Sequence, residues 1–183
     1  MNSKQALRKA LRMQRDRLAP QERANASALI TENAVWMAGD AKNIGIYLSF
    51  SSEVDTIDAI ATWLWEDKNI YVPRMQGDDF QWVKLTDFKS FAVNSLGICE
   101  PLEGEIVETA ALDLIFVPLL GFDDVHHRIG YGKGCYDRAL KGYTGLKVGL
   151  CYAMGHVETT YPSEHDIPLD VIITEKEIFS LHR

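Results

Sequence analysis

The residue types best suited to chemistry lie together in one segment, residues 128–138 (RIGYGKGCYDR). Three glycines alternate along it: Gly130, Gly132 and Gly134. Because glycine has no side chain, the backbone N–H groups of such a segment can approach an anion closely. Arg128 and Lys133 add full positive charges, and the N-terminus of a predicted following helix adds a partial one. The segment therefore predicts a site for the phosphates of a nucleotide.

Asp137 extends this pattern, because in the first turn of that helix a carboxylate can hold a cation beside phosphates. The known phosphate motifs do not match. A Walker loop would need glycine at His127, and Cys135 does not replace the Ser or Thr found near its lysine. A Rossmann fingerprint would need glycine at Cys135. Alternating glycines also form plain tight turns, so a turn without a ligand stays open as the alternative.

Other polar residues are weaker candidates. Glu53 and Asp55 follow a predicted strand, in the zone where α/β sheets bind ligands, and Asp55 is interpreted as a helix cap. The adjacent histidines at 126–127 are predicted to be solvated rather than metal ligands. Cys135 is interpreted as structural, since no triad spacing supports a nucleophile. Asp170 precedes a predicted strand and could reach a metal or end a turn.

The elements that must position these residues are predicted from hydrophobic periodicity. Strands are predicted at residues 43–49, 69–74, 80–85, 113–118, 147–152 and 171–174. Helices are predicted from a cap at Asn2 or Ser3 through Leu18, over 20–38, from Asp55 or Thr56 to Trp65, and over 135–141. Alternating helices and apolar strands indicate a three-layer αβα fold with a mostly parallel sheet. We expect a single domain over residues 1–183, with two helices in residues 1–39 packing on it.

The charge is unevenly distributed. The chain has 19 Lys+Arg and 26 Asp+Glu, a net charge of -7, and its 46% apolar residues exclude a disordered chain. Seven basic residues lie within residues 1–23: Lys4, Arg8, Lys9, Arg12, Arg15, Arg17 and Arg23. The rest of the chain therefore has 12 basic and 24 acidic residues, which argues against a surface that grips nucleic acid. The basic helix is either a solvated face or a set of cations that converge on a phosphate.

Cysteine usage and hydropathy indicate the compartment. Three scattered cysteines are too few for a disulfide framework and fit a reducing compartment. No export signal is visible after Met1, and the longest uncharged apolar run, residues 114–122, is interrupted by proline and glycine. We therefore expect a cytoplasmic protein with no membrane or nucleic-acid partner.

Over nearly its whole length the chain resembles the 5-formyltetrahydrofolate cyclo-ligase family, also called methenyltetrahydrofolate synthetases. The specific element is the pattern R-x-G-x-G-x-G-x-Y-D at residues 128–137. Weaker elements follow one another in the family's order: residues 4–8 (KQALR), 48–56 (LSFSSEVDT), 72–74 (VPR), 100–101 (EP), 112–118 (LDLIFVP), 121–123 (GFD), 163–166 (SEHD) and 169–170 (LD).

The resemblance implies a fold similar to the sugar-phosphate isomerase and CoA-transferase group, and a reaction that depends on ATP and Mg²⁺. ATP phosphorylates the formyl oxygen of 5-formyltetrahydrofolate, a neighbouring folate nitrogen attacks the activated carbon, and phosphate leaves to give 5,10-methenyltetrahydrofolate. Positioning and charge neutralisation would be the enzyme's main tasks. The resemblance leaves a monomer and a dimer equally open.

The resemblance also implies roles for individual residues. ATP would be bound by Lys4, Arg8, Arg128, Gly130, Tyr131, Gly132, Lys133, Gly134, Cys135 and Tyr136. Lys133 and Arg128 would be the catalytic cations. Folate would be bound by Glu53, Leu48, Phe50, Tyr136 and Arg74. The Glu53 carboxylate would accept paired donors of the pterin edge, and Asp137 together with Asp170 would hold Mg²⁺.

Two positions depart from the family pattern, since Cys135 stands where the family usually has an aromatic residue and His156 where it often has glutamine. Two other functions also remain open. One is a different ATP-dependent ligase or kinase on the same scaffold. The other is a nucleotide- or RNA-binding regulatory module that uses the basic helix, whose binding would weaken steeply with salt.

Overall fold

The computed structural model describes residues 3–181, and its centre is an eight-stranded sheet in the order β12-β11-β10-β7-β1-β2-β3-β6. These strands are β1 (Asn43–Gly45), β2 (Asn69–Gln76), β3 (Asp79–Lys84), β6 (Ile106–Val107), β7 (Leu114–Pro118), β10 (Leu146–Leu150), β11 (Val171–Ile173) and β12 (Ile178–Ser180). The five strands from β11 to β2 are parallel, whereas β12, β3 and β6 pair antiparallel with their neighbours. The predicted mostly parallel sheet is confirmed.

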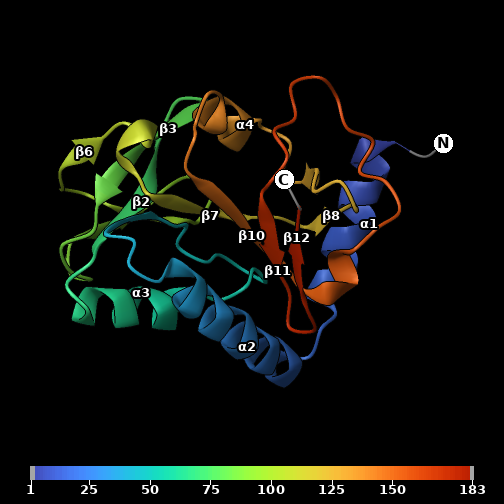
Figure 1. The fold of residues 1–183 in the computed structure, drawn as a ribbon, viewed down its shortest axis with the longest axis horizontal. Coiled ribbons are helices and arrows are strands. Elements are labelled where there is room, and N and C mark those ends of the chain that lie inside the picture. The colour runs from blue at the N-terminus through green and yellow to red at the C-terminus, as the bar shows by residue number, and fades with distance from the viewer. Residues whose placement is uncertain (1–2, 182–183) are drawn as a thin grey trace.

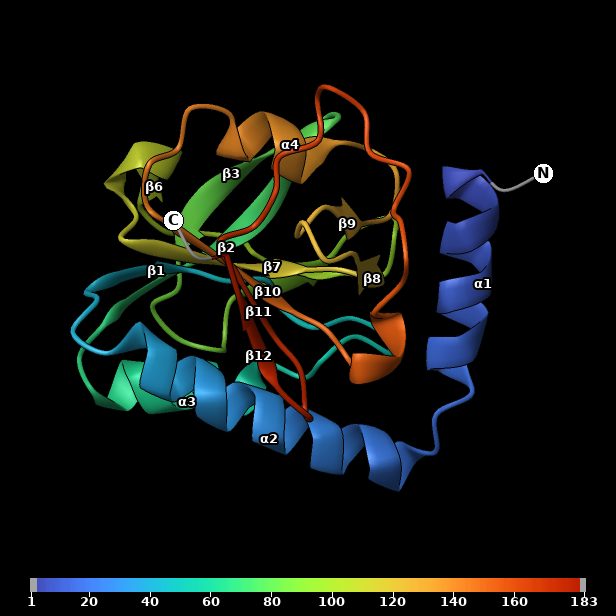
Figure 2. The same ribbon diagram turned by 45° about the vertical axis from the view of Figure 1, so that its right-hand side comes forward.

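Helices cover both faces of this sheet. They are α1 (Lys4–Asp16), α2 (Pro20–Ala38), α3 (Ile57–Trp65) and α4 (Cys135–Leu140), with short 3-10 helices η1 (Thr109–Ala111) and η2 (Ala153–Gly155). Helices α2 and α3 lie along one face, and α4 lies over the other (Figure 1). Helix α1 stands at the side of the molecule, next to the small hairpin of β8 (Gly121–Phe122) and β9 (Arg128–Ile129) (Figure 2). This arrangement confirms the three-layer α/β fold.

Strand β7 shows why its sequence predicts a buried strand. Its side chains alternate between two cores: Leu114 and Phe116 pack on the side of α2 and α3, and Ile115 and Val117 on the side of α4. Trp63 of α3 stacks on the Phe116 ring with centroids 5.2 Å apart. A strand that is covered on both faces must be apolar at every position, which gives a continuous run rather than an alternating one.

Helix α1 is fixed against the β8–β9 hairpin. Ser3 caps it by accepting a hydrogen bond from the Ala6 N–H at 3.2 Å, while Asn2, the other predicted cap, lies outside the described residues. Leu11 is buried in a small core with hairpin residues. A Cβ at Gly121 would come within 2.6 Å of a Leu11 methyl carbon, so the close approach of helix and hairpin requires glycine there. This packing sets the position of α1's charged residues.

Several sequence predictions differ from the structure. The predicted strand at 43–49 ends at Gly45, and the short strands β4 (Phe91–Val93), β5 (Cys99–Pro101), β6, β8, β9 and β12 were not predicted, because two or three residues show no periodicity. Gln14, placed on the apolar face of α1, is exposed. The prediction of a solvated His126 is wrong: the side chain is buried, and Nδ1 lies 3.1 Å from the Leu169 carbonyl oxygen.

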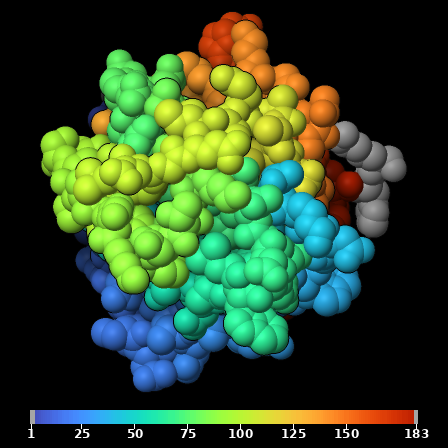
Figure 3. Space-filling model, turned by 90° about the vertical axis from the view of Figure 1, so that its left-hand side faces the viewer, coloured from blue at the N-terminus to red at the C-terminus, as the bar shows by residue number. Residues whose placement is uncertain are grey.

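The β4–β5 sheet forms part of the surface in Figure 3, where its lime-coloured chain lies beside the teal residues of α3. Glu100 of β5 joins it to β2, because its carboxylate accepts a hydrogen bond from the Met75 N–H at 2.9 Å. Among residues 3–181, no helix has the length and apolar character needed to cross a membrane.

Candidate active site

The basic helix α1 meets the glycine-rich loop, residues 130–134. Arg8 Nε donates a hydrogen bond to the Gly130 carbonyl at 2.7 Å. Gly132 has a φ of +97°, which favours glycine, and a Cβ there would lie 3.1 Å from the Arg8 guanidinium carbon, so that the guanidinium would have to shift. Lys4, one turn before Arg8, forms an ion pair with Asp166. The side chains of two predicted phosphate ligands therefore contact other residues of the protein, and that of Arg8 contacts the glycine-rich loop.

Arg128 and Asp137 pair with each other across the loop. Arg128 is buried, and its guanidinium donates to the Asp137 carboxylate at 2.9 Å and to the Ile167 carbonyl at 2.8 Å. The Ile167 N–H donates to the same carboxylate oxygen at 3.0 Å. Because an unpaired buried guanidinium would be strongly destabilising, this cluster ties β9, α4 and the segment before β11 into one unit.

The outer end of the loop is tied to the β2–β3 turn. Arg138 donates to the Lys133 carbonyl at 3.0 Å and to Asp79 at 2.5 Å. Cys135 Sγ donates to the Asp78 carbonyl at 3.0 Å, which agrees with its structural interpretation. The Lys133 residue itself is exposed. The backbone of the loop is thus held in place while this lysine faces outward.

Glu53 is joined to the loop through Tyr131. The Tyr131 hydroxyl donates to Glu53 Oε1 at 2.9 Å, and the Phe50 N–H donates to Oε2 at 2.8 Å. Burial raises the pKa of Glu53 above its usual value, and these two donors together with the Arg15 charge oppose the rise. A half-buried carboxylate held at both oxygens therefore lies beside the loop.

Arg15 was predicted only as one of the cations of the basic helix, and the predicted site residues do not include it. Its side chain is only 3% exposed, and its guanidinium donates to the Tyr131 hydroxyl at 2.7 Å and to Ser52 Oγ at 3.0 Å. Ser52 in turn donates to Asp16. The spacing of Arg15, four residues after the buried Leu11, was the available signal that it faces inward.

The other predicted folate residues lie at various distances from this network. The Tyr136 ring packs on Phe80 with centroids 5.0 Å apart, and Leu48 is half-buried against the core on the α2–α3 side. Arg74 donates to the Leu102 carbonyl at 3.0 Å, so its guanidinium holds the end of β5. The prediction that Arg74 binds an anion has no further support from these contacts.

The structure does not join the two predicted metal ligands through any contact that it describes. Asp170 pairs with Lys147 at 2.8 Å, at the starts of β11 and β10, whereas Asp137 pairs with Arg128. No group of three or more His, Cys, Asp or Glu residues within residues 3–181 is arranged to hold a metal ion. Asp137 beside the loop still offers the kind of single carboxylate that Mg²⁺ uses when phosphates supply its other ligands.

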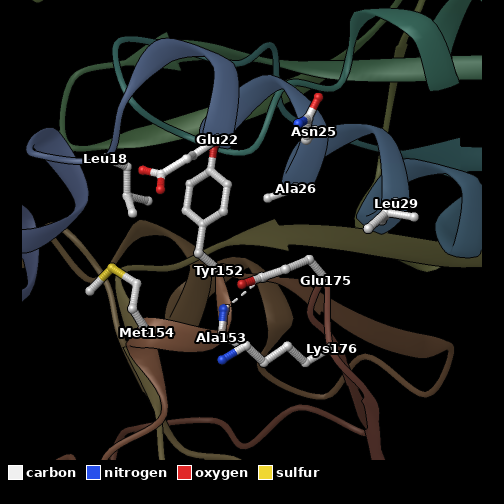
Figure 4. A pocket seen from close by; sticks show the side chains of 10 residues that line it. All are labelled: Leu18, Glu22, Asn25, Ala26, Leu29, Tyr152, Ala153, Met154, Glu175 and Lys176. Carbon is white, nitrogen blue, oxygen red and sulfur yellow. Dashed lines mark hydrogen bonds between the residues drawn. The ribbon is translucent and has the colours of Figure 1, made fainter.

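A separate groove of about 490 Å³ lies next to this network, between α2 and the segments that follow β10 and β11 (Figure 4). Its lining residues are Leu18, Glu22, Asn25, Ala26, Leu29, Tyr152, Ala153, Met154, Glu175 and Lys176. Tyr152 separates it from the site, because its hydroxyl lies 3.1 Å from the Glu53 carbonyl oxygen and 3.2 Å from Ser27 Oγ. None of the predicted site residues lines this groove.

Comparison with known proteins connects this arrangement to one family. A profile of the 5-formyltetrahydrofolate cyclo-ligase family matches residues 1–175. The 5-formyltetrahydrofolate cyclo-ligase of Mus musculus is 32% identical over 95% of this chain and 94% of its own, and that of Haemophilus influenzae is 30% identical over 93% and 97%.

Solved structures agree with the sequence matches. The 5,10-methenyltetrahydrofolate synthetase of Aquifex aeolicus superposes with a TM-score of 0.86 at 32% identity, covering 98% of this chain and 93% of its own. The synthetase of Mycoplasma pneumoniae shares the fold, with a TM-score of 0.80 at 23% identity over 95% and 99% of the two chains. This chain therefore belongs to the 5-formyltetrahydrofolate cyclo-ligase family.

Proposed function

We propose that this enzyme converts 5-formyltetrahydrofolate and ATP into 5,10-methenyltetrahydrofolate, ADP and phosphate. The family match and the names of its relatives support this reaction. Within the site, the observation that supports this reaction is that one loop contacts both a cation and a carboxylate. Residues 130–132 touch the Arg8 cation on one side and the Glu53 carboxylate on the other. A nucleotide and a folate bound to these groups would be neighbours.

The reaction has two steps in this proposal. The formyl oxygen attacks the γ-phosphorus of ATP, and the bond to ADP breaks. A neighbouring folate nitrogen then attacks the formyl carbon and loses its proton, and phosphate leaves with the former formyl oxygen. Because no covalent bond to the protein forms, the residues act by orienting the two substrates and by neutralising charge.

The proposed roles follow from the positions of the side chains. Arg8 and Lys133 would contact the ATP phosphates, and Lys133 has a free approach because it is exposed. Arg128 would act from within its pair with Asp137, so its guanidinium orientation is fixed before the nucleotide binds. Glu53 would bind donors of the pterin edge. The oligomeric state and the cytoplasmic location stay predictions.

Asp137 would also hold Mg²⁺ together with phosphate oxygens, and the ion would neutralise charge on the transferred group. We leave Asp170 out of this proposed site, because its partner Lys147 lies at the start of β10, whereas Asp137 lies directly after the glycine-rich loop. Since Asp137 supports buried Arg128, Asp137→Asn is the suitable variant: it keeps a hydrogen-bond acceptor for the guanidinium and removes the carboxylate charge.

The test is spectroscopic. Protein, Mg-ATP and 5-formyltetrahydrofolate are mixed, and the ultraviolet band of the methenyl product is followed. We expect the band with the wild type, and a loss of about 10²-fold or more in kcat for Lys133→Ala, as is typical when a group that stabilises developing charge is removed. Lys141→Ala is the matched control, since this lysine is also exposed and follows α4. A folded wild-type protein that gives no band would overturn the proposal.

The RNA-binding alternative receives no support from the contacts of α1. Lys4 pairs with Asp166, Arg8 with the Gly130 carbonyl, and Arg15 is buried. An arm that binds a phosphate backbone would present these three cations to solvent together with the exposed Lys9 and Arg12. We therefore put forward no second function.

A further inference from the structure

Hydrogen-bond polarity gives the network around Glu53 a fixed direction. A guanidinium has donors and no acceptor, so the Tyr131 oxygen must accept from Arg15 at 2.7 Å. The single hydroxyl proton of Tyr131 is then free to point in one direction only, toward the Glu53 carboxylate at 2.9 Å. Arg15 therefore decides where the Tyr131 proton lies.

The position of the Tyr131 side chain depends on these hydrogen bonds, because its ring is not packed in the core. The residue is 42% exposed on the glycine-rich loop. The Arg15 guanidinium carbon also lies 5.8 Å from its ring centroid, which adds a weak cation–π contact. Arg15 itself is fixed by its second hydrogen bond to Ser52. A rigid cation on α1 thus holds an exposed tyrosine in place over the carboxylate.

We infer that Arg15 is a positioning residue for the substrate site: through Tyr131 it orients the Glu53 carboxylate for a ligand that has two hydrogen-bond donors. This inference rests on the proposed function, in which Glu53 binds the folate. A carboxylate has about four lone-pair positions, and within residues 3–181 the donors that contact this one are the Phe50 N–H and the Tyr131 hydroxyl, one on each oxygen. One position on each oxygen stays available, which suits two parallel donors from a planar ring.

Packing alone does not account for Arg15. Leu11 already supplies the apolar contact of α1 with the hairpin, and an apolar side chain at position 15 would avoid the cost of burying a charge. The titratable groups around Glu53 are Arg15 from α1, Tyr131 and Tyr136 from the loop and α4, and Tyr47 and Tyr152 from the segments after β1 and β10. In the part of the chain that the structure describes, Arg15 is the cation that acts on Glu53.

The test compares Arg15→Gln and Tyr131→Phe with the wild type, and uses Arg12→Gln, an exposed arginine of the same helix, as the control. We measure kcat and the KM for 5-formyltetrahydrofolate across pH. Both variants remove an interaction that favours ionised Glu53, so the acid limb of kcat/KM should move to higher pH. KM should rise about tenfold, which is the effect expected from the loss of one hydrogen bond to a charged group. The value of kcat should change less than about twofold. The control should match the wild type.

The outcomes separate this inference from the proposed function. If Arg15→Gln or Tyr131→Phe keeps the wild-type acid limb and KM, the positioning role is wrong. If Glu53→Gln itself keeps the wild-type KM, Glu53 does not bind the folate and the underlying assignment fails instead. If Arg15→Gln does not fold, Tyr131→Phe decides the question, because an exposed ring tolerates this change. An Arg15 that only stabilises the fold would lower the melting temperature and leave the acid limb unmoved.

Discussion

Replacing Gly132 with alanine tests whether α1 and the glycine-rich loop form one site. Two penalties arise at this position. The φ of +97° is unfavourable for a residue with a side chain, and the new Cβ would lie 3.1 Å from the Arg8 guanidinium carbon. Since Arg8 is the end of a flexible side chain, it would move aside and lose its hydrogen bond to the Gly130 carbonyl. The substitution therefore separates the helix cation from the loop.

The size of each penalty follows from a comparison with Gly142. That glycine has a φ of +76° and no atom within 4 Å of a built Cβ. Gly142→Ala should therefore show backbone strain alone, about 1 kcal/mol after the gain from a less flexible unfolded chain. Gly132→Ala adds the lost Arg8 hydrogen bond, about 1.5 kcal/mol for a charged donor, for a total of about 2–3 kcal/mol.

The assay is urea unfolding of both variants together with calorimetric titration of ATP. We expect Gly132→Ala to be less stable than Gly142→Ala and to bind ATP about tenfold more weakly, whereas Gly142→Ala binds ATP normally. In an Arg8→Ala background, the extra cost of Gly132→Ala should disappear, since the contact no longer exists. Equal destabilisation by the two alanines, with unchanged ATP binding, would refute the view that Arg8 and the loop act as a unit.

Two further predictions concern α1 and Glu53. Leu11→Ala removes a side chain that is 2% exposed and should lower the free energy of unfolding by about 2–4 kcal/mol in urea titrations; a loss below about 1 kcal/mol would show that α1 is not anchored there. Burial raises the pKa of Glu53, so the folded state holds this proton more tightly than the unfolded state. The free energy of unfolding of the wild type, compared with that of Glu53→Gln, should therefore fall as the pH rises from the usual pKa of glutamate to the raised pKa of folded Glu53. Equal pH slopes for the two proteins between about pH 4 and 7 would contradict this.

The sequence predicted the centre of the fold well, for a physical reason. Strands such as β7 are covered on both faces, so burial alone makes them apolar and visible in the sequence. The β8–β9 hairpin was not predicted, because two residues per strand give no period to detect. Yet this hairpin anchors α1 and starts the glycine-rich loop. The part of the fold that positions the site was thus the part with the weakest sequence signal.

The candidate site was predicted by residue type but not by partner. Arg128 and Asp137 were interpreted separately, one as a phosphate ligand and one as a metal ligand, whereas the structure pairs them at 2.9 Å. This ion pair depends on the path of the loop between β9 and α4, and the spacing of residue types in the sequence does not determine that path. The burial of Arg15 was missed for a related reason: a cation on an amphipathic helix is ordinarily solvated, and the partners that compensate its burial, Tyr131 and Ser52, lie far from it in the sequence.

The net charge of -7 was a poor guide to the ligand, and the contacts of α1 explain why. Lys4, Arg8 and Arg15 point toward partners within the protein, whereas Arg12 and Arg17 are exposed. The first three follow the inner side of the helix because the packing of Leu11 on the hairpin sets its rotation. Their charge acts locally, on partners a few ångströms away, where distance and burial matter more than the sum over the chain. An acidic protein can thus bind a polyanionic nucleotide, provided that a few cations are fixed at one place.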